Sequence, residues 1–526
     1  MLGSVGRLMF KNEETEKFQS DEAAIQPNGY LMVLNKEDLK VVKASNNFSK
    51  IVVGGAKTIL GHTFDELFGA AITANLRRRI NQEGRVLMLI SGDFPLFDQR
   101  RFNCFVQTQG DRILIEMEET HETAEASTEQ TVALTDAVAT FGSVKNIEEL
   151  VELIPPEIKK LTGFDRVMVY KLDQAMTGEI IAERVSEGMD SFLNFSFPAQ
   201  DITLETCESY CRNTVRAVPD SHYEPAALVG DSQPTDLSNC ALASASKNHI
   251  AHLRNNGIGA SLSISIVCNG RLWGLIVCHH RKAKPIPHWL RSYCEVVGKL
   301  ISLRISAYED NTERDLKEKL RRFFERVREH PVREALEAAL LNSAPTILEL
   351  FDGKGMALIS GDTIRTYPVT PANIDISRYA DWLKTSGQKH FFVEDNLRSK
   401  FPLEGMIETA SGVITMSFPA YDMSIHIFRP ELTQTFTWAS SIFMSVEKAR
   451  SQVHPFEVLR QTIEKHSAPW TLNQMFMAQV FFDSMKSTLA AIESKYTESQ
   501  NSRDFCKATD SHSTSESHSA SESGDT

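Results

Sequence analysis

Four stretches between residues 163 and 281 carry many of the side chains in this chain that are suited to binding chemistry. In order they are GFDRVMVYKLD, FPAQDI, SKNHIAHLRNNGIGASLSIS and GRLWGLIVCHH. They supply the carboxylate of Asp201 and the imidazoles of His249 and His279, and the guanidinium of Arg216 lies between them. Such groups, converging on one cavity, suit a cofactor that exchanges protons near neutral pH. Polar side chains at strand ends are also ordinary satisfied groups of folded domains, so the residues alone leave both interpretations open.

Secondary-structure signals place these side chains in one α+β domain. Residues 148–163 have the pattern of a helix, and residues 165–172 follow as a strand. Two later strand-like runs, 261–267 and 271–280, flank Asn269-Gly270, a dipeptide typical of two-residue hairpin turns. We therefore expect an antiparallel sheet whose strands carry the polar residues.

The chain on both sides also alternates helix and strand. Between residues 25 and 119, short apolar runs separated by Asn-Lys-Glu-Asp and Thr-Gln-Gly-Asp predict a mixed module built on an antiparallel sheet. A Glu/Thr-rich stretch, 119–130, is expected to separate it from the next domain. Residues 288–331 predict a long connecting helix, because apolar residues recur at helical spacing among dense charges. A third α+β domain follows, and the Ser/Glu-rich end is too polar to bury a core.

Composition narrows the class of protein. A chain of 526 residues is too long for one core, so several domains are expected. The net charge of −13 argues against a nucleic-acid surface. No apolar run is long enough for a membrane span, and no signal peptide is present, so a cytoplasmic location is predicted.

Known catalytic and metal-binding motifs are missing from the sequence. The eight cysteines lack a zinc-site spacing, and Cys207 with Cys211 on one helix face is interpreted as packing, with a redox pair or a weak metal site as the alternatives. No phosphate-loop, nucleophile-elbow or zinc-peptidase motif occurs, and no kinase or cyclase segment follows Lys495. We therefore predict no enzymatic activity, no catalytic residue and no metal ligand.

Together the four stretches resemble the bilin-binding domain of bacterial phytochromes, which are red/far-red photoreceptors. The same resemblance extends to IQPNGYLMVLN at Ile25, FRPE at Phe428, TW at Thr437 and PW at Pro469. It implies an α+β fold of three sensory modules with antiparallel sheets, the PAS, GAF and phytochrome-specific (PHY) domains, joined by long helices. It also implies that the N-terminal segment passes through a loop of the GAF domain in a figure-of-eight knot.

The resemblance divides the chain into six parts. They are a mobile segment 1–20, a PAS domain 21–125, a GAF bilin-pocket domain 131–308, a connecting helix 309–330, a PHY domain 331–495 and a disordered tail 496–526.

The resemblance also assigns binding roles by position. Asp201, followed by Ile202, would accept hydrogen bonds from the pyrroles, and His249 and His279 would flank the rings. The aromatic walls would be Tyr170, Phe197 and Tyr210. The propionate contacts would be Arg216, Ser246, Ser261 and Ser263.

Several positions depart from the family pattern. Bacterial members attach the bilin through a cysteine shortly before IQPHG, and other members through a cysteine at the position of Asn248; here neither Ser20 nor Asn248 can supply a thiolate. Ala243 stands where an arginine would clamp a propionate, and His252 where a tyrosine would lie. Covalent attachment at either familiar position is therefore excluded.

The tongue of the PHY domain departs as well. Its PRxSF motif is replaced by QVHPF at residues 452–456, which has no arginine to pair with Asp201. In the family, light refolds the tongue as that pair breaks or forms. We therefore expect a switch that is weakened, altered or lost.

These observations predict a phytochrome-like sensory protein with a degenerate pocket, which binds biliverdin or another bilin without a covalent bond or binds none. One alternative is a red/far-red photoreceptor with an unusual linkage; Cys278 is the nearest thiol, although strand alternation turns it away from the face of His279. The other is a chromophore-free redox or protein-interaction module. Signalling is expected through a homodimer or a separate kinase or regulator, and the 471–498 helix is either a dimer seam or packed in its own domain.

Overall fold

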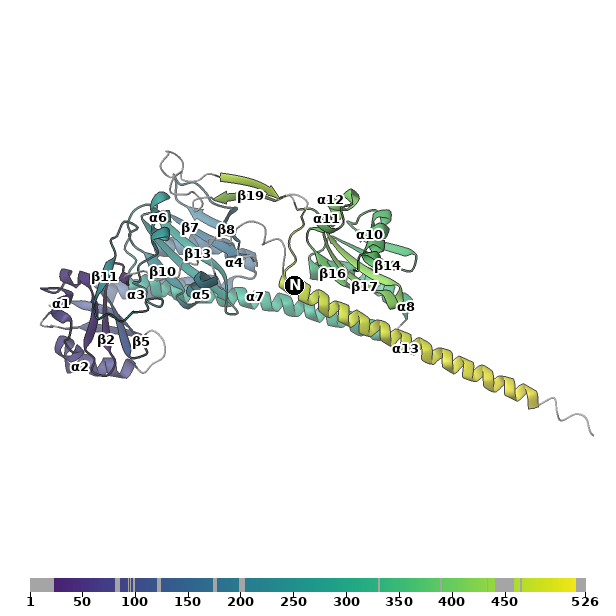
Figure 1. Ribbon diagram of the computed structural model, residues 1–526, viewed down its shortest axis with the longest axis horizontal. Coiled ribbons are helices and arrows are strands. Elements are labelled where there is room, and N and C mark those ends of the chain that lie inside the picture. The colour runs from purple at the N-terminus through teal and green to yellow at the C-terminus, as the bar shows by residue number, and fades with distance from the viewer. Residues whose placement is uncertain are drawn as a thin grey trace, which may run out of the picture. The chain divides into compact units, whose positions relative to one another are not determined.

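The computed structural model describes residues 23–80, 86–92, 94, 96–97, 100–120, 124–173, 177–197, 204–329, 332–387, 390–432, 434–439, 458–463 and 466–516. The chain forms two compact units (Figure 1). One comprises residues 1–306 with 438–458, and the other comprises residues 307–437 with 459–526. The first unit contains two sheets and the second contains one further sheet.

The first domain is built on an antiparallel sheet, as predicted. Its strands are β1 (Ala24–Ile25), β2 (Tyr30–Asn35), β3 (Val41–Ser45), β4 (Val86–Ser91), β5 (Arg101–Gln109) and β6 (Arg112–Glu119). The sheet order is β1-β11-β3-β2-β6-β5-β4, in which β11 (Ala226–Gly230) comes from the second domain. The short helix α1 (Ala56–Ile59) and the helix α2 (Phe64–Arg79) complete the domain. Thr63 and Glu66 form a capping box at the start of α2, which fixes where that helix begins.

The start of the described chain is held by the second domain. Ala24 pairs with Ala227, and Gln26 Nε2 donates to the carbonyl oxygens of Ala217 at 2.9 Å and Ala243 at 3.2 Å. Farther along, Arg112 on β6 forms an ion pair with Asp231 at 2.5 Å. The loop that follows β11 is thus fastened to the first sheet. Passage of the chain through this loop as a knot stays a prediction.

The second domain contains the polar stretches. Its strands follow the order β10-β12-β13-β7-β8-β9. They are β7 (Arg166–Leu172), β8 (Gly178–Val185), β9 (Phe195–Phe197), β10 (Val215–Val218), β12 (Ala260–Cys268) and β13 (Arg271–His280). Positive φ angles of 50° at Asn269 and 76° at Gly270 confirm the predicted hairpin turn.

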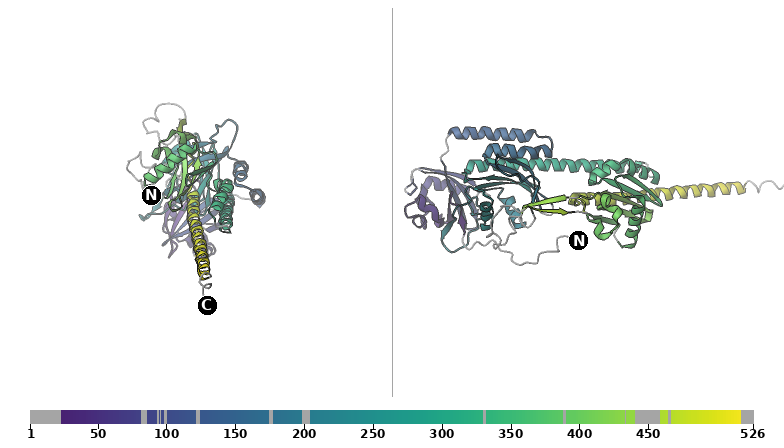
Figure 2. Two further views of the ribbon diagram at one scale, coloured as in Figure 1. Left: turned by 90° about the vertical axis from the view of Figure 1, so that its right-hand side faces the viewer. Right: turned by 90° about the horizontal axis from the view of Figure 1, so that it is seen from above.

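Helices border this sheet. Along one side run α3 (Ala124–Ser143), α4 (Ile147–Thr162) and the first part of α7 (His288–Glu329) (Figure 2). The helices α5 (Leu204–Arg212) and α6 (Lys247–Asn255) carry polar residues of the candidate site. The predicted helix 148–163 and the long helix after residue 288 are confirmed. The stretch 119–130, expected to separate the first two domains, contains the start of α3 at Ala124, where Ala and Glu favour helix.

The third domain has a sheet with the order β15-β14-β18-β17-β16. Its strands are β14 (Gly355–Ser360), β15 (Thr363–Pro368), β16 (Phe391–Glu394), β17 (Gly412–Phe418) and β18 (Met423–Arg429). The helices are α8 (Arg333–Asn342), α9 (Ala344–Phe351), α10 (Asn373–Thr385), α11 (Leu397–Lys400), α12 (Ile407–Ala410) and α13 (Leu472–Glu516). Two further strands, β19 (Gln434–Ala439) and β20 (Val458–Ile463), occur in the chain between β18 and α13.

The helices α7 and α13 share the larger core of the third domain. Phe323 and Phe324 on α7 contact the ring of Phe481 on α13, with ring centroids 6.2 and 5.4 Å apart. Docking of the 471–498 helix into its own domain is therefore confirmed for this part of α13. A second core surrounds Tyr379 of α10, which is fully buried.

The helix α13 corrects the expected disorder of the tail. It continues to Glu516, whereas chain disorder was expected from residue 496. The physical reason is that residues 472–516 contain neither proline nor glycine, so nothing in the local sequence ends the helix. In the described part of the chain, no helix is both long and apolar enough to cross a membrane.

His426 gives the third domain a predictable dependence on pH. Its ring is fully buried, with Nδ1 3.0 Å from Thr415 Oγ1 and Nε2 2.9 Å from Ser424 Oγ, and burial lowers its pKa to about 3. Below the unfolded-state pKa of about 6.5 the unfolded chain binds the proton and the folded chain does not. Local stability should therefore fall by about 1.4 kcal/mol per pH unit from pH 6 to 4.

Native-state hydrogen exchange of β17 and β18 amides, corrected for intrinsic rates, measures this slope. His426→Gln should lack this contribution. An equal slope in both proteins would contradict the assignment.

Candidate functional site

Strand register gathers the polar residues on one face of the second sheet. Ser261 on β12 pairs with His279 on β13, and Ser263 pairs with Arg216 on β10. Tyr170 on β7 pairs with Leu275 on β13. Directly paired residues share a face, as do residues two apart along a strand. These five predicted site residues therefore lie on the same side of the sheet.

Tyr210 on α5 covers one end of this face. Its ring lies 4.7 Å from the Arg216 guanidinium, and its hydroxyl is hydrogen-bonded to Ser263. Arg216 also donates through Nη2 to Ser209 Oγ, while its buried Nε has no hydrogen-bond partner among the described residues. Arg216 thus has a free N–H donor close to the hydroxyl groups of Ser209 and Ser263. This arrangement suits a carboxylate ligand.

Three histidines lie close to one another at this face. The rings of His249 and His252 on α6 are nearly parallel, with centroids 6.5 Å apart. Burial, followed by the charges of Arg166, His252 and His249, lowers the pKa of His279 to about 3. Desolvation by the surrounding protein, together with His252 and Arg216, lowers the pKa of His249 to about 4, and the residue is exposed at the surface. Both rings are therefore neutral at pH 7.

His279 is 9% exposed, and its Nδ1 has no hydrogen-bond partner among the described residues. A buried polar atom without a partner costs free energy, so a ligand that bonds to it gains affinity.

The remaining predicted residues are placed differently. Ser246 is the N-cap of α6, where its hydroxyl accepts a hydrogen bond from the His249 amide at 3.2 Å. Ser246 therefore has a structural role in capping α6, in addition to the propionate contact predicted for it. Phe197 ends β9, and only its backbone is described. Asp201 and Ile202 lie outside the described residues, as does QVHPF at 452–456.

Arg166 is a site residue that the sequence interpretation missed. It pairs with His279 across β7 and β13, and its Nε lies 3.1 Å from Glu183 Oε1. The side chains are 5% and 3% exposed, and the guanidinium lies 3.7 Å from the centroid of the Phe192 ring. The signal was present in the sequence, because Arg166, Met168 and Tyr170 alternate along one strand and so share a face.

Tyr170 is held in place by its neighbours. A Cβ atom at Gly178 on β8 would overlap the Tyr170 ring, so glycine at that position leaves room for it. Met168, Ile180, Phe192 and Leu275 pack with Tyr170 in one apolar cluster. The face thus combines an apolar wall with a row of hydroxyl, imidazole and guanidinium groups, as small-molecule sites do.

The cysteines near the site differ in access. Cys278 is fully buried on the face opposite to His279, and burial together with Cys294 on α7 raises its thiol pKa well above the usual value. The expected alternation of Cys278 and His279 is therefore confirmed. Cys207 and Cys211 on α5 are partly exposed and unbonded. Among the described residues, no cluster of histidine, cysteine and carboxylate side chains could hold a metal ion.

Comparison with known proteins gives three successive family matches. Residues 14–120 match the PAS fold, residues 146–307 the GAF domain and residues 320–493 the phytochrome region. Fold and family matches thus define a three-domain sensory protein whose GAF domain carries a row of polar side chains on one face of its sheet. The chain belongs to the phytochrome family and corresponds to its photosensory core.

Relatives and solved structures agree with this assignment. Cyanobacterial phytochrome B of Nostoc sp. is 30% identical over 470 residues, covering 86% of this chain and 62% of that protein. The bacteriophytochrome of Pseudomonas aeruginosa is 25% identical, covering 87% of this chain and 64% of that protein. A bacteriophytochrome structure from the photosynthetic bacterium R. palustris has a TM-score of 0.70 at 26% identity and covers 89% of this chain and 97% of its own. The chain spans about three fifths of the length of its curated relatives.

The placement of the cysteines predicts their reactivity. Iodoacetamide should alkylate Cys207 and Cys211 in the native protein, because both thiols are accessible. Cys278 and Cys294 should react only after unfolding, because they are buried and their thiolates are disfavoured. Peptide mass spectrometry after native and denatured labelling measures this difference. Rapid native labelling of Cys278 would contradict its assignment to the core face.

Proposed function

We propose that the GAF domain binds biliverdin or a similar bilin without a covalent bond, and that the chain is a sensory protein. The observation that supports this most is the buried His279 Nδ1, without a described partner, on the same face as Arg216, Ser261 and Ser263. A bilin supplies a conjugated, light-absorbing chain with polar pyrrole groups and two carboxylates. The residues present fit such a molecule in both chemistry and arrangement.

Each residue has a distinct task in this proposal. Arg216, held against Tyr210 and Ser209, would bind a propionate together with the Ser263 hydroxyl. His279, neutral at pH 7, would exchange a hydrogen bond with the polar edge of a ring. Tyr170 and its apolar neighbours would exclude water from the ring faces. Asp201 and Ile202 keep their predicted roles from the family resemblance, together with Phe197 and Ser246.

The absence of a cysteine at the two attachment positions used in the family supports non-covalent binding. Neither Ser20 nor Asn248 can form a thioether, and Cys278 lies on the opposite face of the sheet. Affinity must then come from the polar row and the apolar wall alone. Because Ala243 replaces one expected arginine, we expect weaker retention than in relatives with both arginines.

Signalling is proposed to pass through a homodimer and a separate partner such as a kinase or regulator, with no enzymatic activity in this chain. On α3 and α7 of the first unit, Val138, Val296 and Leu303 are 40%, 45% and 69% exposed, and these apolar side chains are the proposed dimer contact. The domain boundaries given above, apart from the disordered tail, belong to the same proposal, as do a cytoplasmic location and the knot.

Assembly with biliverdin tests the pigment-binding proposal. The purified chain should give a red absorbance band and lose it after acid-urea denaturation and filtration, because no thioether holds the pigment. Zinc-dependent fluorescence on a denaturing gel should be absent. Arg216→Met should weaken binding roughly tenfold to a hundredfold, the effect of losing one charge-assisted contact.

A matched control is Arg271→Met, which removes an exposed arginine at the hairpin turn of the same sheet. Its affinity for biliverdin should equal that of the original chain. Lack of any binding would overturn the proposal in favour of a chromophore-free interaction module. Zinc fluorescence that survives denaturation would instead demonstrate covalent attachment.

The dimer has its own test. Leu303→Asp places a charge among the exposed apolar residues of α7 and should shift the protein toward monomer in sedimentation-velocity experiments. Lys57→Glu, which changes an exposed charge on α1 of the first domain, serves as the control. Unchanged sedimentation of Leu303→Asp would contradict an interface at this face.

A further inference from the structure

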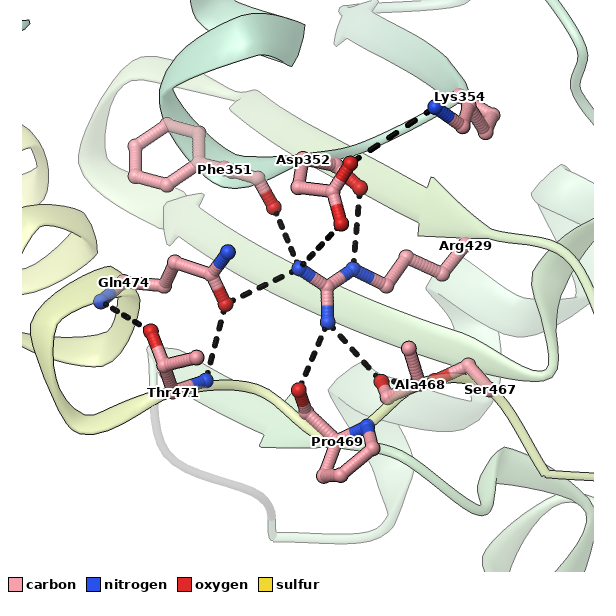
Figure 3. A network of polar contacts seen from close by, with 9 residues as sticks. All are labelled: Phe351, Asp352, Lys354, Arg429, Ser467, Ala468, Pro469, Thr471 and Gln474. Carbon is pink, nitrogen blue, oxygen red and sulfur yellow. Dashed lines mark hydrogen bonds and ion pairs between the residues drawn. The ribbon is translucent and has the colours of Figure 1, made fainter. Parts of the chain in front are cut away.

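Arg429, the last residue of β18, forms a saturated network in the PHY domain (Figure 3). Its side chain is 4% exposed. A guanidinium has five N–H groups, and here each has an acceptor at 2.9 to 3.0 Å. The acceptors are the carbonyl oxygens of Phe351, Asp352, Ala468 and Pro469 and the side-chain oxygen of Gln474. Lysine offers three donors around one point and cannot reproduce this set.

The network joins three segments that are far apart in the sequence. Phe351 and Asp352 are the C-terminal end of α9, where carbonyl groups lack helical partners. Ala468 and Pro469 belong to the stretch before α13, and the Trp470 ring lies 3.8 Å from the guanidinium. The Asp352 carboxylate, 3.4 Å away, balances the charge. Arg429 thus fixes the stretch 466–470 against α9.

Arg429 lies close to both ends of the segment that connects Leu432 to His466. The amide of Leu432, three residues after Arg429, donates to His466 O at 2.7 Å. The chain between these two positions includes residues 438–458, which are grouped with the first unit. Any displacement of the returning end therefore acts on carbonyl groups that Arg429 holds.

Gln474 connects Arg429 and the stretch 466–470 to the first turn of α13. Its side-chain oxygen accepts from the Thr471 amide at 2.9 Å and from Arg429 Nη2 at 3.0 Å. The Gln474 amide donates to Thr471 Oγ1 at 3.1 Å, which completes a capping box. One oxygen atom therefore both caps the helix and contacts Arg429.

We propose that Arg429 is a coupling residue, which transmits displacement of the returning stretch 466–470 to the start of α13. When Ala468 and Pro469 move, the guanidinium loses acceptors and shifts, and Gln474 is drawn out of the cap. The first turn of α13 then opens. This device lies in the PHY domain and does not depend on whether the GAF domain binds a bilin.

The test perturbs the stretch 466–470 and measures the opening of the first turn of α13. Trp470→Phe removes the hydrogen bond from Trp470 Nε1 to Glu394 O, which is 3.0 Å long, and keeps an aromatic ring beside the guanidinium. Hydrogen exchange of residues 473–478 is followed by mass spectrometry in the full chain. We expect Trp470→Phe to accelerate this exchange roughly tenfold, as local opening of a helix end does. In the Arg429→Lys background the same substitution should have no further effect.

Two controls separate coupling from general destabilisation. Arg365→Lys changes another arginine of this domain, one with a single ion pair to Glu337, and should leave the response to Trp470→Phe intact. Gln474→Met retains Arg429 but removes the shared oxygen, and should abolish the response even if Arg429→Lys does not fold. The proposal is overturned if Trp470→Phe leaves residues 473–478 unchanged, or accelerates them equally with and without Arg429 and Gln474.

Discussion

Strand alternation across β7, β12 and β13 is the constraint on which the GAF domain depends. Every second residue faces the site, and those between them face the helices α4 and α7. Leu262, Ile264 and Cys278 fill the helix side, while Ser261, Ser263 and His279 occupy the other. A shift of one residue in register would bury the serines in the core and expose the isoleucines. The core and the site are therefore specified by the same hydrogen-bond ladder.

Local signals predicted much of this architecture. The hairpin at Asn269-Gly270, the helix before Gly163 and the long helix α7 each follow from residues close together in the sequence. Low hydrophobicity predicts disorder at the end of α13, whereas the structure has a helix there, because local helix propensity does not require burial. A segment can contain too few apolar residues to form a core and still have residues that favour a helix.

The contacts of the arginines could not be predicted so directly. Arg429 binds mainly carbonyl oxygens, which every residue has, so no partner residue is recognisable in the sequence. Arg166 does have a recognisable partner in Glu183, but pairing them requires the register of β7 and β8. The histidines were predicted from family positions, whereas their mutual effect on pKa arises from the folded arrangement. The sequence shows which side chains are present, but the charges that surround each histidine are known only from the folded structure.

The attachment of the first residues to the second domain has a consequence for biosynthesis. β1 pairs with β11, and Gln26 bonds to carbonyl groups 191 and 217 positions later. A growing chain emerges from the ribosome N-terminus first, so β1 waits without its partner while about 200 residues are translated. Contacts of such long sequence separation form slowly, because closing the loop costs entropy before any contact rewards it. The edge of the PAS sheet at β3 is therefore covered by β11 only late in synthesis. Until then, chaperones can bind the unpaired strands.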